Sequence, residues 1–441
     1  MYGRCCYRMR SFGALLRPVL IRYLPGITLC RPSLWMGSRT MPGDKGQPDG
    51  AVRELARAVS GLADGALLVA LALSLLAPAV STWAESPVGG SSGGTNTVYL
   101  SFVAANVRLP GHIGYGANVS AADNARYLAE IGFDWAKGFV SLDYHSSQHD
   151  WVQADNQIRE YLRYGVSKAL LRLTDGAPPR SESELALFQE ASRSLAVHVA
   201  ATWRPQGLRQ VAYEVWNEPN LDYEWRGGAP DPAAYVAVLR AAYLGIKAGD
   251  PAATVVSGGV ATTGASPQAW LGTAGYMDDL EFIRGMYRAG GAAYFDALGS
   301  HPYGGGTEPE VVRGAPYFRR AEEQRQVMLE FGDAETPVWA TEFGWIGRCE
   351  QCDLGEHERV EVSYAQQAGY LVRAFRYAEA NWPWMGPMFV FNLDFGTVDW
   401  YEYCDPIRWY SVLYRENPKS DPGSVIFGRE ALDALRAMPK N

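Results

Sequence analysis

Residues 210–261 read QVAYEVWNEPNLDYEWRGGAPDPAAYVAVLRAAYLGIKAGDPAATVVSGGVA. The stretch opens with a short apolar run that ends in WNEPN at residue 220, continues into a helical pattern from Pro232 to Ala248, and closes with a second apolar run at 253–261. Short apolar runs favour buried strands, and the longer segment between them favours a helix. A strand–helix–strand unit with nearly continuous apolar strands is typical of a parallel sheet that is covered by helices.

The same alternation extends over the chain from residue 112 onward. The predicted strands lie at 112–119, 133–142, 168–175, 210–220, 253–261, 295–304, 337–345 and 386–395. The predicted helices lie at 121–132, 156–164, 181–203, 232–248, 280–289, 317–331, 364–380 and 429–438. Eight strands alternating with eight helices favour a closed α/β fold, the (β/α)8 TIM barrel. An open doubly wound sheet would carry a glycine-rich phosphate loop after its first strand, and the turn Gly114–Asn118 lacks the third glycine of that loop.

Residues 1–60 form a leader, and the first forty of them contain seven arginines and no acidic residue. An organelle transit peptide has this composition. A leader read upstream of the true start, with Met36 or Met41 beginning the mature frame, explains it equally well. The sequence leaves both interpretations open and assigns this segment no fold.

An uninterrupted apolar run, GALLVALALSLLAPAV, occupies residues 65–80. We interpret the segment 61–84 as a signal peptide, cleaved near Ala84, or as an uncleaved anchor that associates with a membrane through residues 65–83. A structural helix packed against the folded domain is the competing interpretation.

A flexible linker of Gly and Ser composition follows at residues 85–99. The globular domain is therefore expected at 100–441. Because a signal peptide or an anchor would export this domain, we expect an extracellular or cell-surface location, either secreted or membrane-anchored.

The composition of the chain excludes some partners. The formal charge is −8, and no Lys/Arg run appears in the last three quarters of the chain, so we expect no nucleic-acid partner. Cys349, Cys352 and Cys404 lie in the predicted domain, and a disulfide between two of them is expected, without a choice between the pairings. No second Cys/His pair with zinc-ligand spacing follows Cys349 and Cys352, so neither a metal nor a cofactor is expected. The oligomeric state is left open.

Two glutamates mark the predicted carboxyl ends of strands. The fourth strand ends in Asn217-Glu218-Pro219, and the seventh runs into Thr341-Glu342. Catalytic residues of TIM barrels lie at these strand ends, so both carboxylates are expected at the same face of the barrel. A pair of carboxylates, one ionised and one protonated, is the requirement of glycoside hydrolysis with retention.

These strand ends carry a family resemblance. Trp216-Asn217-Glu218-Pro219 and Thr341-Glu342-Phe343-Gly344 resemble the corresponding segments of clan A glycoside hydrolases, especially families 39 and 5, over roughly residues 110–415. The resemblance implies that Glu218 is the acid/base, that Glu342 is the nucleophile, and that Asn217 binds the sugar 2-hydroxyl. It also implies that His301 and Tyr303, which follow the sixth strand, lie beside the two carboxylates.

Further candidates for substrate binding come from other strand ends. Asn118 and Lys137 could line the cleft, although Lys137 could equally serve an ion pair, and Arg172 is expected to pair with a carboxylate such as Glu342. The remaining candidates are Trp345, Phe391 and Trp400. The chain departs from the clan pattern here, because many members place a Trp on the eighth strand as the floor of the sugar site, whereas this strand carries Phe391 and no Trp occurs before Trp400.

The expected function is retaining hydrolysis of O-glycosidic bonds in a polysaccharide or oligosaccharide. Two alternatives use the same residues. A non-catalytic carbohydrate-binding barrel would keep the fold without turnover, although the presence of both glutamates argues against it. A transglycosylase would differ only in the acceptor that intercepts the glycosyl-enzyme. The identity of the sugar, its linkage, and endo or exo action are not determined by the sequence.

Overall fold

The computed structural model describes residues 112–440, apart from residue 227, residues 265–274, residues 314–315, and residues 417 and 422. The predicted leader, apolar segment and linker lie outside the described residues, as does the expected domain start near residue 100. No helix among the described residues combines the length and the apolar character that crossing a membrane requires.

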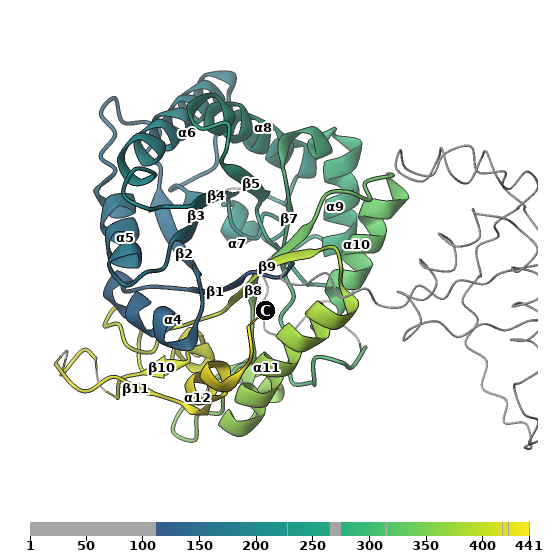
Figure 1. Cartoon of the computed structure of the whole chain (residues 1–441). Helices are drawn as coiled ribbons and strands as arrows, with labels where there is room; N and C mark the ends of the chain where they lie inside the picture. The colour runs from purple at the N-terminus through teal and green to yellow at the C-terminus, as the bar shows by residue number, and fades with distance from the viewer. Residues whose placement is uncertain are drawn as a thin grey trace, which may run out of the picture. The chain divides into compact units, whose positions relative to one another are not determined.

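Within the described residues, nine strands form one parallel sheet in the order β5-β4-β3-β2-β1-β9-β8-β7-β6. They are β1 (Tyr115–Asn118), β2 (Trp135–Ser141), β3 (Lys168–Thr174), β4 (Gln210–Val215), β5 (Thr254–Ser257), β6 (Val260–Ala261), β7 (Leu298–His301), β8 (Val338–Phe343) and β9 (Met385–Val390). Figure 1 shows these strands as a ring with helices around its outside. The predicted α/β architecture of TIM-like type is confirmed.

The two ends of the sheet meet. Only Gly258 and Gly259 separate β5 from β6, so these two strands are consecutive pieces of one segment. Val256 of β5 also forms a parallel bridge with Ala297, directly before β7. Because β6 pairs with β7 as well, the sheet curls back onto itself.

The prediction of one continuous strand at 253–261 was wrong. The Gly259 backbone forms hydrogen bonds with two glutamates in place of strand pairing. Its N–H donates to Glu214 Oε1 (3.2 Å), and its carbonyl accepts from the backbone N–H of Glu218 (3.1 Å). A side chain at Gly259 would overlap the His301 ring. The strand is therefore interrupted where other side chains approach its backbone closely.

Helices cover the outside of the barrel (Figure 1). The helical segments of the described residues, including the short ones in the loops, are η1 (Ala122–Asn124), α4 (Ala125–Ile131), α5 (Val152–Arg163), α6 (Glu182–Trp203), α7 (Asp222–Trp225), α8 (Pro232–Gly249), α9 (Asp279–Arg288), η3 (Gly291–Tyr294), α10 (Arg320–Glu330), η4 (Gly355–Val360), α11 (Tyr364–Asn381), η5 (Pro406–Tyr410) and α12 (Glu430–Ala437). A short pair, β10 (Leu413–Tyr414) and β11 (Phe427–Gly428), is antiparallel. Local signals set the helix starts: Ser181 and Glu184 form a capping box, and Asp231 caps α8 ahead of Pro232.

The barrel interior consists of an apolar layer below a charged layer. Trp135, Trp339 and Phe389 pack together, with ring centroids 5.2–6.5 Å apart. Successive same-face side chains on a strand are two residues apart. The next positions after the apolar residues Trp135, Leu170, Ala212 and Trp339 are therefore Lys137, Arg172, Glu214 and Thr341. The charged layer lies toward the carboxyl ends of the strands, where the site is expected.

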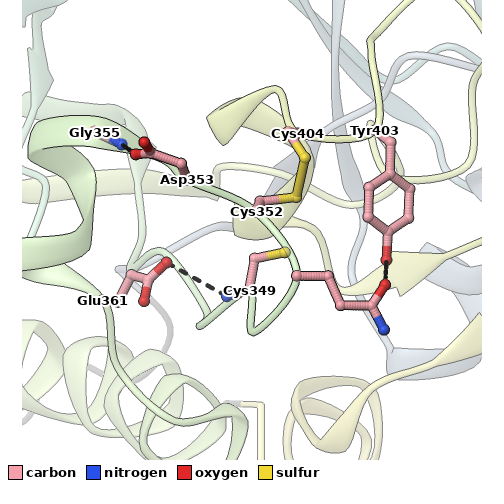
Figure 2. The surroundings of a disulfide bond; sticks show 8 residues. Cys349, Cys352, Asp353, Gly355, Glu361, Tyr403 and Cys404 are labelled. Carbon is pink, nitrogen blue, oxygen red and sulfur yellow. Dashed lines mark hydrogen bonds between the residues drawn. A yellow bond between two sulfur atoms is a disulfide. The ribbon is translucent and has the colours of Figure 1, made fainter.

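A disulfide joins two loops at this end of the barrel. Cys352, in the loop after β8, is bonded to Cys404, in the loop after β9, whereas Cys349 is free and buried. Figure 2 shows Cys349 close to this bond, with its backbone N–H directed to Glu361. The expected disulfide is thus present, and the structure decides which two cysteines form it.

We predict that Gly259→Ala destabilises the barrel. The new Cβ would overlap the His301 ring and lie 2.6 Å from Thr341 Oγ1, and overpacking of a core typically costs about 1–3 kcal/mol. Gly176→Ala is the matched control, because nothing lies within 4 Å of its added Cβ. Denaturant melts of both variants provide the measurement, and equal stability of the two would contradict the close packing at Gly259.

Candidate active site

A pocket of about 820 Å³ opens at the carboxyl ends of the barrel strands. Loops after β4, β7, β8 and β9 supply most of its surface, including the two loops joined by the disulfide. The polar and aromatic side chains that line it include Arg172, Asn217, Glu218, Tyr223, Glu224, Tyr303, Glu342, Phe391, Phe395, Trp400, Tyr401 and Tyr410.

The chain turns sharply after β4 to present Glu218. Trp216 and Glu218 have φ values of 73° and 36°, a conformation that is uncommon for residues other than glycine and costs about 1–3 kcal/mol per residue. Hydrogen bonds on both sides hold the turn. The Trp216 indole N–H donates to the Glu224 carbonyl (2.9 Å), and the Glu218 backbone N–H donates to Gly259. The Glu218 side chain is 15% exposed and lines the pocket.

Glu342, on β8, is surrounded by donors and cations. Its Oε1 accepts from Lys137 Nζ (3.0 Å) and lies 3.8 Å from Arg172 Nη1. Its Oε2 accepts from the Tyr303 hydroxyl (2.8 Å) and lies 3.6 Å from His301 Nδ1. Burial favours the neutral acid, but the charges of His301, Lys137 and Arg172 outweigh it and hold the pKa of Glu342 below its usual value.

The Tyr303 hydroxyl is a permanent donor to this carboxylate. Burial, together with the charge of Glu342, raises the pKa of Tyr303 well above its ordinary value. The hydroxyl therefore keeps its proton throughout the physiological range, and its bond stabilises the ionised form of Glu342.

Lys137, on β2, is fully buried at the centre of the charged layer. Its ammonium donates to Glu342 Oε1 (3.0 Å) and to the Thr341 carbonyl (3.2 Å), and it forms an ion pair with Glu214 Oε2 (2.7 Å). The buried charge is therefore compensated by two carboxylates and one carbonyl. Burial raises the pKa of Glu214, but the charges of Lys137 and His301 hold it well below its usual range.

His301, at the end of β7, connects two of the acids. Its Nδ1 lies 2.8 Å from Glu218 Oε1, and its Nε2 lies 3.7 Å from Glu214 Oε1. Burial lowers the pKa of His301, but Glu342, Glu214 and Glu218 together raise it to about 9. The ring is therefore an imidazolium at neutral pH, and its Nδ1–H donates to Glu218.

Arg172 fixes the orientation of Asn217. Its Nη1 donates to Asn217 Oδ1 (2.9 Å), and its guanidinium lies over the Phe139 ring, 4.5 Å from the centroid. This bond occupies the amide oxygen of Asn217, and the amide NH₂ is a donor that faces Glu224. Arg172 also approaches Glu342, as predicted.

Most of the candidates from the sequence come together here. Glu218, Glu342, Asn217, Tyr303, Arg172, Phe391 and Trp400 line the pocket, and Lys137 and His301 lie directly behind them, bonded to carboxylates. Asn118 and Trp345 do not line it, which corrects the prediction for both residues. The Asn118 amide donates to the carbonyls of Thr341 and Val390, and the buried Trp345 donates to Thr307, so both serve the packing of the barrel.

Sequence reasoning missed several groups at this site. Pocket-lining residues from loops that no motif distinguishes are Tyr223, Glu224, Phe395, Tyr401 and Tyr410. Glu214 is a fully buried acid in β4. The sequence feature that could have identified Glu214 is its position as a charged residue within the apolar strand segment VAYEV.

Glu218, His301 and Glu342 are the described residues whose ligand atoms could surround a metal ion, since one such atom of each lies within 4.8 Å of the others. Their charges already have partners. Lys137 and Arg172 flank Glu342, and His301 carries a proton at neutral pH. Because a metal ion would be repelled by these three cations, the arrangement favours a hydrogen-bonded pair of acids over a metal site.

Comparisons with solved structures find the same fold in glycoside hydrolases. A family 39 glycoside hydrolase from the gut symbiont Bacteroides cellulosilyticus WH2 matches with a TM-score of 0.54 and 18% identity, over 77% of this chain and 66% of that chain. A bacterial orthologue of human α-L-iduronidase matches with a TM-score of 0.51 and 14% identity, over 75% of this chain and 56% of that chain. The chain therefore spans about two thirds of the length of the first structure and just over half of the second.

No protein-family model and no curated protein matches the sequence. At the identities of the two solved structures, the similarity concerns the fold. The strand ends indicate a resemblance to clan A glycoside hydrolases, and the solved structures confirm it for the barrel fold.

We predict that Lys137→Met strongly destabilises the protein. The substitution leaves the buried carboxylates of Glu214 and Glu342 without their shared cation, and breaking a buried ion pair from one side costs about 3–5 kcal/mol. Lys168→Met is the matched control, because Lys168 pairs with Asp134 (2.6 Å) where both side chains are partly exposed, and such pairs contribute at most about 1 kcal/mol. Urea unfolding of the two variants measures the difference, and similar losses would contradict the central role of Lys137.

Proposed function

We propose that the protein is a retaining glycoside hydrolase that acts on a polysaccharide or oligosaccharide, with Glu342 as nucleophile and Glu218 as acid/base. The observation that carries the proposal is the approach of the two carboxylates at the ends of β8 and β4, with an oxygen of each within 4.8 Å of the other. Retaining enzymes hold their carboxyl groups about 5–5.5 Å apart, whereas inverting enzymes need about 6.5–9.5 Å to admit a water molecule.

The environments of the two acids support their different roles. Glu342 is nearly buried, receives bonds from Lys137 and Tyr303, and has a lowered pKa, so it is ionised and aimed for attack. Glu218 is more exposed and, among the described side chains, is bonded to His301. The protonated His301 can supply a proton to Glu218, and it can take one back only after it has given its own away.

Two displacements follow from these roles. In the first, a Glu342 oxygen bonds to the anomeric carbon while the glycosidic C–O bond breaks, and Glu218 gives its proton to the leaving oxygen. In the second, Glu218 removes a proton from water, the water oxygen bonds to the anomeric carbon, and the bond to Glu342 breaks. Both inversions together retain the configuration of the sugar.

Asn217 supports the same assignment as a donor to the sugar. Arg172 occupies its amide oxygen, so the NH₂ group is the donor that would meet the hydroxyl beside the reacting carbon. Such a contact contributes to catalysis when it strengthens as positive charge develops on the ring.

An aromatic wall, formed by Tyr303, Phe391, Phe395, Tyr401 and Trp400, supports an extended carbohydrate substrate. Neighbouring rings in this order have centroids 5.3–6.4 Å apart. The wall begins at the Tyr303 hydroxyl, which is bonded to Glu342, and ends at Trp400, which is 60% exposed. Among the described tryptophans only Trp400 is exposed, and an exposed aromatic face at a pocket rim suits the apolar face of a sugar ring.

The proposal includes export. The apolar segment at 61–84 supports a signal peptide or an anchor, and the disulfide between Cys352 and Cys404 is of the kind that persists in oxidising compartments. A domain at 100–441, secreted or attached to a membrane, fits both observations.

We predict that Glu218→Ala separates the two chemical steps. Aryl glycosides with good leaving groups need little acid assistance, so they should still form the glycosyl-enzyme, whereas substrates with poor leaving groups should lose about 10²–10⁴-fold in kcat/KM. Azide should restore turnover, because it needs no general base, and the product should be a glycosyl azide of retained configuration. Kinetics with a series of aryl glycosides and NMR of the product provide the measurement.

Glu342→Gln is the companion variant and should lose turnover with every leaving group, without rescue by azide. Activity within about tenfold of wild type, a barrier change below about 1.4 kcal/mol, would show that Glu342 is not the nucleophile. Equal losses for good and poor leaving groups in Glu218→Ala, without an azide effect, would reduce Glu218 to a structural role. Products longer than the substrate would identify a transglycosylase.

We predict that Trp400→Ala impairs long substrates selectively. Loss of one stacking contact should lower kcat/KM for oligosaccharides by about 2- to 12-fold, while a small aryl monosaccharide, bound beside Glu342, should be nearly unaffected. Phe427→Ala is the control, because Phe427 is an exposed aromatic residue that does not line the pocket. Equal effects of Trp400→Ala on short and long substrates would contradict an outer sugar contact at the aromatic wall.

A further inference from the structure

Glu214 is fully buried in β4 and forms ion pairs with Lys137 and His301, the partners of the two proposed catalytic acids. Its Oε2 lies 2.7 Å from Lys137 Nζ, and the same ammonium donates to Glu342. Its Oε1 accepts from the Gly259 N–H and lies 3.7 Å from His301 Nε2, while Nδ1 of that ring contacts Glu218. The Glu214 carboxylate is thus connected to Glu342 through Lys137 and to Glu218 through His301.

We propose that Glu214 is a positioning residue of the active site, which sets the orientation and the charge of Glu342 and Glu218 through Lys137 and His301. It touches neither the pocket nor the reacting atoms. The inference deepens the proposed function and rests on it for its kinetic consequences, but the charge it assigns to His301 can be measured without any substrate.

The geometry gives Glu214 two tasks. Glu214 forms an ion pair with Lys137 through Oε2 (2.7 Å) and so holds the ammonium beside Glu342, to which Lys137 donates. It also places a negative charge behind the buried His301 ring, which stabilises the imidazolium that faces Glu218. The titratable and charged groups that face this cluster from the surrounding elements are Lys137 (β2), Arg172 (β3), Glu218, Tyr223 and Glu224 (after β4), Tyr235 (α8), His301 (β7), Tyr303 (after β7), Glu342 (β8), and Tyr401 and Tyr410 (after β9).

The direction of the effect follows from the charge. Removing the negative charge of Glu214 makes every neighbouring proton easier to lose. The alkaline limb of kcat/KM, which reports loss of the proton that His301 holds against Glu218, then moves to lower pH. The acid limb, which reports protonation of Glu342, moves in the same direction. The whole profile therefore shifts toward acid.

The kinetic test compares Glu214→Gln with Glu214→Asp. Even in bulk water, a unit charge 4 Å away changes a pKa by about 0.7 unit, so Glu214→Gln should shift both limbs by at least about that much. Glu214→Asp keeps the charge and should keep the wild-type limbs, even where its kcat is lower. Glu322→Gln, which removes a partly buried acid bonded to Tyr377 and Trp382 on the outside of the barrel, should leave the profile unchanged.

The second readout is the NMR titration of the His301 ring, assigned by its absence in His301→Gln. The midpoint should lie near 9 in the wild type, fall in Glu214→Gln by at least about 0.7 unit, and stay near 9 in Glu214→Asp. If Glu214→Gln does not fold, the double variant Lys137→Met, Glu214→Gln removes the ion pair as a unit, and His301 should titrate at lower pH there as well.

The two readouts separate the possible failures. An unchanged midpoint of His301 in a folded Glu214→Gln protein would overturn the inference, as would equal shifts in Glu214→Gln and Glu214→Asp. A uniform loss of activity at all pH values, with unmoved limbs, would leave Glu214 a purely structural residue and would also overturn it. A wild-type protein without glycosidase activity would instead overturn the proposed function, and the titration of His301 would still decide the role of Glu214.

Discussion

The buried ammonium of Lys137 is the interaction on which the site depends. A cation taken out of water loses several kcal/mol of hydration, and only good hydrogen-bond geometry compensates this loss. Lys137 donates hydrogen bonds to Thr341 and Glu342 and forms an ion pair with Glu214. These partners belong to β4 and β8, which are not neighbours in the sheet. The ammonium therefore ties β2 to two other strands across the barrel interior.

This arrangement makes the two pocket acids unequal. Glu342 lies among Lys137, Arg172 and the Tyr303 hydroxyl, all of which favour its ionised form. Glu218 is farther from these groups, more exposed, and, among the described side chains, bonded to His301. Placing two carboxyl groups in different environments is the general way in which one site runs both nucleophilic and acid–base chemistry at the same pH. In the proposed mechanism, the division of roles between the two acids therefore rests on the distribution of cations and not on the residue type, which is the same for both.

The barrel supplies a rigid base, and the loops supply the surface that a substrate would meet. Below the charged layer, the rings of Trp135, Trp339 and Phe389 fill the interior. Above it, the loops after β8 and β9 carry much of the pocket lining, and the disulfide between Cys352 and Cys404 joins them. The aromatic wall follows the second of these loops outward to Trp400. The strands hold the two acids rigidly, whereas the loops carry the aromatic residues. In this fold the groups proposed for the reaction and those proposed for substrate selection therefore lie on different elements.

The sequence by itself determined the alternating α/β architecture, the strand ends that carry Glu218 and Glu342, and the small set of cysteines from which the disulfide is drawn. These features depend on neighbours along the chain: the alternation of apolar strands and helices, the Asn-Glu-Pro turn, and the period of two along a strand. Only the tertiary structure decided that Lys137 bonds to Glu342, 205 positions away, that Glu214 belongs to the same cluster, that the fifth strand breaks at Gly258–Gly259, and that Asn118 and Trp345 face the barrel packing. These contacts join residues on opposite sides of the barrel. Which residues meet depends on the register between strands that are far apart in the sequence, and this register cannot be read from neighbouring residues.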